Sequence, residues 1–85
     1  MVEHIRKSMR ISHESLDDEI QRNMDACKLD AKLAGVYLTE DALSEKAYEL
    51  YNKWQFDYLG KGVQFEEAYR KLKDAMALSG DYPDV

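Results

Sequence analysis

The stretch YELYNKWQFDYLGKG, residues 48–62, places five aromatic side chains within eleven consecutive positions. In a helix with about 3.6 residues per turn, three of these rings fall in the same sector as the apolar residues that precede them. The members of this sector are Leu43, Ala47, Leu50, Tyr51, Trp54 and Tyr58. The spacing therefore predicts a helix that runs to about Tyr58, stops at Gly60 and buries these rings in a core.

A second side of the same helix carries Tyr48, Phe56 and Leu59, with Asn52 between them. A single small domain has little chain with which to cover both sides of one helix. We therefore expect this second side to be a subunit interface, where aromatic rings supply a large contact area at a low entropic cost.

The rest of the chain also has helical periodicity, with no convincing alternation of the kind that strands show. Apolar residues recur at helical spacing in residues 2–10, 16–34 and 64–78. The sequence predicts an all-α fold, a small helical bundle of three principal helices plus a short N-terminal helix. It is predicted to form one domain over residues 1–85, with residues 79–85 as a polar C-terminal tail.

The long helix carries two separate apolar faces in its second half. Its main stripe consists of Leu16, Ile20, Met24, Cys27, Ala31 and Ala34. Ala26, Leu29 and Leu33 lie well round from that stripe, so a neighbour is expected to contact the helix from a second side. These three residues are the other half of the candidate subunit interface.

Local signals predict where the helices begin and end. Ser12 and Ser15 are suitable N-caps for the long helix, and Thr39 for the next one. Gly35 is a natural stop for the long helix, because glycine readily adopts the left-handed conformation that follows a helix.

The composition restricts the class of protein. The net charge is −5, with 17 acidic against 12 basic residues, which disfavours non-specific binding to nucleic acid. The single cysteine, Cys27, excludes an internal disulfide and fits a reducing compartment. No apolar run approaches the length of a membrane span, and the N-terminal MVEHIRKSMR has no apolar signal core, so neither insertion nor secretion is expected.

Catalytic and metal-binding patterns are missing from the sequence. His4, His13 and Cys27 are the soft ligands, and none is spaced from another as zinc ligands are. The acidic run 17–19 fans apart by about 100° per residue, so its carboxylates cannot all face one ion, and it suits the first turn of a helix instead. GKG at 60–62 lacks the spacing of a phosphate-binding loop. We expect no enzyme activity, no cofactor and no metal.

A small helical DNA-binding or regulatory protein is the alternative reading. It would use two basic clusters, and the last helix would be a recognition helix. The clusters are Arg6, Lys7 and Arg10, and separately Lys61, Arg70, Lys71 and Lys73. Acidic residues interleave with these bases, so solvated faces or ion pairs are the simpler interpretation.

Two blocks of the sequence resemble the small head–tail connector proteins of long-tailed bacteriophages, also called adaptor or DNA-packaging proteins. The first is IRKSMRISHESLDDEIQRNMDACKLDAKLAGV, with a short helix, a polar histidine-containing turn and an acidic cluster that opens a long helix. The second is LSEKAYELYNKWQFDYLGKGVQFEEAYRKLKDAMALSGDY, with an aromatic–glycine break followed by F..AY..LK and a closing LSGDY. Together the blocks cover most of the chain.

The resemblance implies a structural role in the virion. Such proteins are α-helical and form a homo-oligomeric ring, typically twelvefold, beneath the capsid portal at the head–tail junction, after synthesis in the host cytoplasm. The ring binds the portal protein, extends the conduit for genomic DNA without sequence-specific binding, and is the platform for stopper or tail-completion proteins. No catalytic residue belongs to this role.

A ring requires two different patches per subunit, because its contacts are heterologous. The candidates are the two apolar sides described above. The tail residues Asp81, Tyr82 and Pro83 are the candidate portal-docking segment. The acidic balance is expected to repel DNA phosphates, so that the genome slides through the channel.

Overall fold

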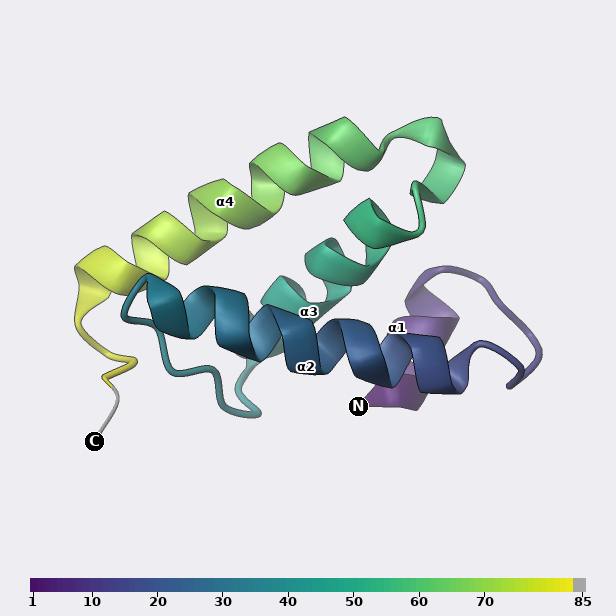
Figure 1. Ribbon diagram of the computed structural model, residues 1–85, viewed down its shortest axis with the longest axis horizontal. Coiled ribbons are helices and arrows are strands. Elements are labelled where there is room, and N and C mark those ends of the chain that lie inside the picture. The colour runs from purple at the N-terminus through teal and green to yellow at the C-terminus, as the bar shows by residue number, and fades with distance from the viewer. Residues whose placement is uncertain (84–85) are drawn as a thin grey trace.

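The protein is all-helical over the residues that the computed structural model describes, 1–83 (Figure 1). Its elements are α1 (Val2–Ser8), α2 (Asp17–Leu33), α3 (Ala42–Gln55), the 3₁₀ turn η1 (Tyr58–Gly60) and α4 (Gly62–Ser79). The predicted fold class, three principal helices with a short N-terminal one, is therefore confirmed. The third helix ends at Gln55 rather than near Tyr58, because the chain turns into the left-handed region at Asp57.

Helix α3 is the element that the other helices share. It packs against α1, α2 and α4, and in Figure 1 it lies behind α2 and below α4. The side chains enclosed between these helices form one core, which the C-terminal segment joins. The fully buried apolar members include Ile5, Ile20, Cys27, Ala31, Val36, Ala47, Tyr48, Tyr69 and Met76.

The end of α2 follows the predicted stop at Gly35. Gly35 has φ 78°, and its N–H donates to the carbonyl oxygen of Lys32 at 2.9 Å. The next N–H, of Val36, reaches back to the carbonyl oxygen of Ala31 at 2.9 Å. This pair of bonds satisfies two carbonyls at the helix end, and both Val36 and Ala31 are buried beneath it.

The predicted N-caps are wrong at both helices. The residue before α2 is Leu16, without a side-chain cap, and Ser15 instead pairs its hydroxyl with His13 Nδ1 at 2.6 Å. The cap of α3 is Asp41, whose Oδ1 accepts from the Ser44 N–H at 2.9 Å. Thr39 lies in the preceding loop, where its N–H donates to the Ser44 hydroxyl at 2.9 Å. Several cap-forming residues compete in each of these segments, and tertiary packing selects among them.

The corner between α3 and α4 has an unusual backbone. Asp57 (φ 49°) and Leu59 (φ 57°) are both left-handed, and Gly60 (φ 68°) follows them. This conformation costs an L-residue such as leucine roughly 1–2 kcal/mol. Asp57 Oδ1 accepts from the Gly62 N–H at 2.8 Å, which fastens the corner to the first turn of α4.

Gly62 leaves no space for a side chain. A Cβ at this position would lie 2.7 Å from Asp57 Oδ1 and 3.2 Å from the Trp54 carbonyl oxygen. We expect Gly62→Ala to reduce the free energy of unfolding by about 1–3 kcal/mol, because the corner must open to admit the methyl group. Chemical denaturation measures this loss.

Gly60→Asn is the matched control, because it adds a side chain to a corner glycine that has room for one. Nothing lies within 4 Å of a Cβ at Gly60, and asparagine tolerates the left-handed region better than other residues. It should therefore cost less than the change at Gly62. Equal stability of the Gly62→Ala variant and the parent would contradict the close approach.

Candidate protein-interaction surfaces

The predicted interface side of α3 is divided between the core and the surface. Tyr48 is 2% exposed, because α2 and the loop before α3 cover its ring, so its assignment to an exposed interface side of α3 is corrected. Phe56 is half-buried against the core, and only Leu59 is largely exposed. Asn52 is also fully buried, where its amide donates to the Tyr48 carbonyl oxygen at 3.0 Å and its Oδ1 accepts from Asn23 at 3.1 Å.

The other aromatic residues of the opening stretch contact one another within the protomer. Tyr51 meets Trp54 edge-on with ring centroids 5.3 Å apart, and it meets Tyr69 of α4 in the same way at 5.2 Å. The Arg70 guanidinium lies 5.5 Å from the Trp54 ring centroid. These rings are half-buried or buried packing between α3 and α4, as the stripe predicted. Leu43 departs from that prediction, since it is exposed at the start of α3.

A polar cluster joins α2 to α4. The Tyr69 hydroxyl donates to Asp30 Oδ2 at 2.6 Å, and Lys73 Nζ donates to the same oxygen at 2.9 Å. Burial and the bond to Asp30 raise the pKa of Tyr69, so its hydroxyl stays a donor. Burial also acts to raise the pKa of Asp30, but the bonds from Tyr69 and Lys73 outweigh it and hold that pKa below the ordinary value. No motif in the sequence pairs these residues, because they come from helices far apart in the chain.

We expect Asp30→Asn to lower the free energy of unfolding by about 1–2 kcal/mol near pH 7, because two hydrogen bonds to a charged acceptor are weakened. The lowered pKa of Asp30 means that its contribution is present above the unfolded pKa, about 3.9, and is lost as pH falls through the folded pKa. The difference between variant and parent should therefore shrink in acid. Denaturation at several pH values measures it, with exposed Asp74→Asn as the control. A pH-independent difference would contradict the ionic contribution.

Cys27 is closed to solvent. Its side chain has no exposed surface, its Sγ lies 3.9 Å from the Ala47 carbonyl oxygen, and burial raises its pKa to about 12. Only the thiolate reacts, so the native thiol is inert.

We expect a thiol reagent at pH 8 to modify Cys27 only at the rate at which the domain opens. Modification should accelerate in step with added denaturant, and mass spectrometry follows it. A Leu29→Cys variant is the internal control, since its added thiol is exposed and should react at once. Rapid modification of Cys27 in the folded protein would contradict its enclosure.

Several bases of the two basic clusters pair with acids inside the protomer. Arg6 lies 3.6 Å from Asp17, and Lys7 lies 3.0 Å from Glu3. In the second cluster the Arg70–Glu66 distance is 2.8 Å, and Lys73 bonds to Asp30 as described. These pairs reduce the positive charge that either cluster offers to a phosphate backbone.

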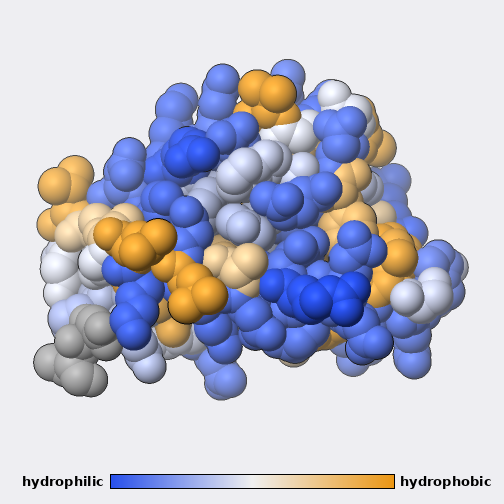
Figure 2. All heavy atoms as spheres, viewed as in Figure 1, coloured by the Kyte–Doolittle hydropathy of each residue, from blue (hydrophilic) through white to orange (hydrophobic). Residues whose placement is uncertain are grey.

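The C-terminal half of α2 exposes apolar side chains. Ala26, Leu29 and Leu33 are all exposed, Leu29 at 67% and Leu33 at 90%, and we call them the α2 surface. Figure 2 shows apolar side chains gathered over this end of α2. Exposed leucines one turn apart on a helix form a continuous strip, which is the usual form of a helix-borne contact.

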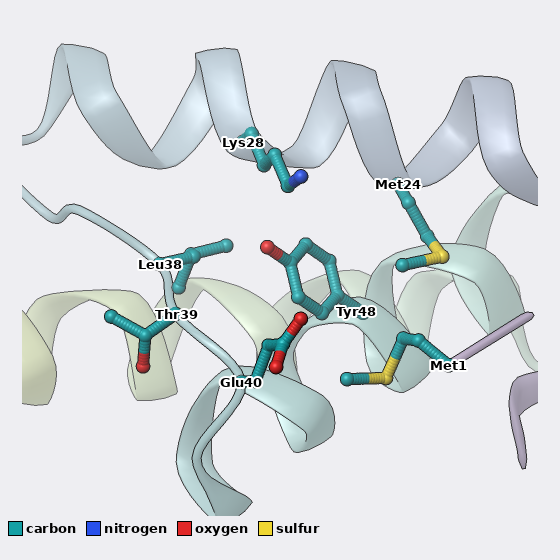
Figure 3. A pocket seen from close by; sticks show the side chains of 7 residues that line it. All are labelled: Met1, Met24, Lys28, Leu38, Thr39, Glu40 and Tyr48. Atoms are coloured by element: carbon teal, nitrogen blue, oxygen red, sulfur yellow. The ribbon is translucent and has the colours of Figure 1, made fainter.

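A groove runs beside the α2 surface. One hollow of about 210 Å³ is lined by Lys28, Leu29, Lys32, Tyr37 and Leu38. It adjoins a second hollow of about 250 Å³, which shares Lys28 and Leu38 with it and is shown in Figure 3. The second hollow is lined in addition by Met1, Met24, Thr39, Glu40 and Tyr48. Together they are called the α2 groove.

A second exposed apolar surface lies at the α3–α4 corner. Leu59 and Val63 are each 70% exposed, and we call them the corner surface. In Figure 1 the corner lies at one end of the molecule, and the C-terminal end of α2 lies at the other. Val63 was not a candidate from the sequence, because it falls outside the stripe of α4 and resembles any isolated surface valine.

The polar tail is partly folded into the domain. Tyr82 is buried, its carbonyl oxygen accepts from the Tyr37 N–H at 2.8 Å, and its hydroxyl donates to Asp41. The bond to Asp41 raises the pKa of Tyr82 to about 12. Tyr82 is therefore corrected from a docking residue to a structural one, while Asp81 and Pro83 are exposed. Residues 84–85 of the predicted tail lie outside the described residues.

Within residues 1–83, no group of three or more His, Cys, Asp or Glu side chains converges as metal ligands would. None of the helices described is both long enough and apolar enough to cross a membrane. Comparisons of the chain with models of protein families, with curated proteins and with solved structures find no match.

Proposed function

We propose that this chain is a structural virion protein, a head–tail connector that forms a ring beneath the capsid portal. The observation that carries the proposal is the presence of two different exposed apolar surfaces on one small protomer. The α2 surface and the corner surface lie at opposite ends of the molecule (Figure 1). Both would be covered if each copy contacted two neighbours.

The two surfaces favour a ring over a compact dimer. A two-fold dimer uses the same patch on both subunits, whereas a ring joins two unlike patches around a rotation axis. The α2 surface is a leucine strip on a helix, and the corner surface is a projecting turn, so the two are not interchangeable. The resemblance of the two sequence blocks to phage connectors agrees with this arrangement.

The proposed partners follow from the same role. The ring would bind the portal protein on one side and a stopper or tail-completion protein on the other. DNA would pass through its channel without sequence-specific contacts, aided by the net charge of −5. We propose neither catalysis nor a cofactor. Because Tyr82 belongs to the domain, portal docking through the tail would fall to exposed Asp81 and Pro83.

The alternative, a small DNA-binding or regulatory protein, has weaker support. Arg6, Lys7, Arg70 and Lys73 form ion pairs with acids of their own chain. A duplex binder would have to break those pairs or bind through the remaining bases.

We expect the purified protein, mixed with the portal protein of the phage or prophage that encodes it, to form annular particles with a central channel. Electron microscopy and mass photometry measure this. Leu33→Asp should abolish the particles without unfolding the domain, because it places a charge within an apolar contact. Exposed Lys71→Asp is the matched control and should leave them unchanged.

A mobility-shift assay with duplex DNA at low and moderate salt distinguishes a connector from the alternative, a DNA-binding protein. A connector should give no shift at moderate salt. A salt-sensitive shift of duplex DNA, together with no particles on the portal protein, would overturn the proposed function in favour of the alternative.

A further inference from the structure

We propose that the corner surface of one copy docks into the α2 groove of the next copy, with Leu59 as the inserted side chain. This inference rests on the proposed function and specifies the contact between neighbouring subunits. It commits to a second copy of this chain as the occupant of the groove.

Leu59 is the first observation behind the proposal. It is a leucine held at φ 57° in a turn that glycine would adopt without strain, and 70% of its surface is exposed. Its own protomer therefore gains little apolar burial from a strained residue. Strained backbone conformations cluster at functional sites, so an observed one suggests a function for the residue that adopts it. Insertion into a neighbour would bury the leucine side chain that the turn projects.

The α2 groove is the second observation. The Tyr48 ring is buried, and its hydroxyl points into the hollow of Figure 3. A hydroxyl that faces a hollow can donate a hydrogen bond to whatever fills that hollow. Lys28 of α2 points toward the same space, with Leu38 and Met24 as apolar walls. The groove thus combines an apolar lining with three polar side chains that can donate hydrogen bonds: Tyr48, Lys28 and Lys32.

The charges of the two surfaces are complementary. The corner carries exposed Asp57 within two residues of Leu59, and the groove carries Lys28 beside its apolar lining. Exposed Lys61 follows on the corner, and Glu40 lines the far part of the groove. The groove therefore offers two lysines, Lys28 and Lys32, and one acid, Glu40, whereas the corner offers one acid and one lysine, so opposite charges on the two surfaces can meet in one register. In Figure 1 the corner lies at one end of the molecule, and the C-terminal half of α2, which contributes Lys28, Leu29 and Lys32 to the groove, extends to the other, so copies would join head to tail.

The Leu59→Gly variant distinguishes a role of Leu59 in the contact between copies from a role in the stability of its own protomer. Glycine relieves the left-handed strain, so the variant should be at least as resistant to heat as the parent. Removal of the inserted side chain should nevertheless weaken self-association at millimolar concentration by about tenfold or more, measured by sedimentation equilibrium. Leu78→Ser, which removes an even more exposed leucine (89%) from α4, is the matched control and should leave association unchanged. A parent that does not self-associate, or a Leu59→Gly variant that associates as the parent does, would overturn the proposal.

Cysteine pairing tests the geometry directly. A Leu59→Cys variant and a Leu29→Cys variant, given tags of different mass, are mixed and oxidised. Native Cys27 does not compete, because it is buried. The mixed disulfide should form in excess over random pairing, whereas a Leu59→Cys and Lys71→Cys mixture should form it no more than at random. Random pairing in both mixtures, or dominant pairing between identical variants, would overturn the corner-in-groove contact.

The two proposals can fail separately. Rings on the portal without selective cysteine pairing would remove the corner-in-groove contact and leave the connector function standing. Selective pairing in open filaments, with no ring on the portal, would keep the contact and remove the connector function.

Discussion

The enclosure of α3 on several sides is the constraint on which the rest of the structure depends. Three helices pack against it, so residues on opposite sides of α3 are covered within one protomer. Tyr48 and Asn52 are buried toward α2, while Tyr51 and Trp54 meet Tyr69 of α4. A chain of this size can surround one helix only by leaving the outer sides of the others uncovered. The exposed leucines of α2 are a direct result.

Helical periodicity predicted most of the fold. The main stripe of α2 and the stop at Gly35 follow from the spacing of apolar residues and from the preference of glycine for the left-handed region. The caps were missed because Thr39 and Asp41 are both good N-cap residues, and the choice depends on what surrounds Ser44. Local chemistry narrows such positions to two or three candidates, and tertiary packing decides between them.

The candidate surfaces were only partly predictable. Ala26, Leu29 and Leu33 are exposed as their position round the helix suggested, but Tyr48 is not. A helical wheel gives the direction in which a side chain points, but not which other part of the chain lies in that direction. The helical pattern therefore could not predict that the loop before α3 covers Tyr48. Tyr82 was missed for the same reason, since its partners are more than forty positions away in the chain.

Asp41 makes hydrogen bonds both to the first turn of α3 and to Tyr82, so it connects the C-terminal segment to the start of the central helix. One carboxylate oxygen caps α3 through Ser44, and the other receives the Tyr82 hydroxyl. A protease that cut between Ser79 and Tyr82 would therefore disturb α3 as well as the tail. The resistance of residues 79–82 to digestion thus reports whether the start of α3 is intact. The same segment is a poor place at which to attach a fluorophore or an affinity tag.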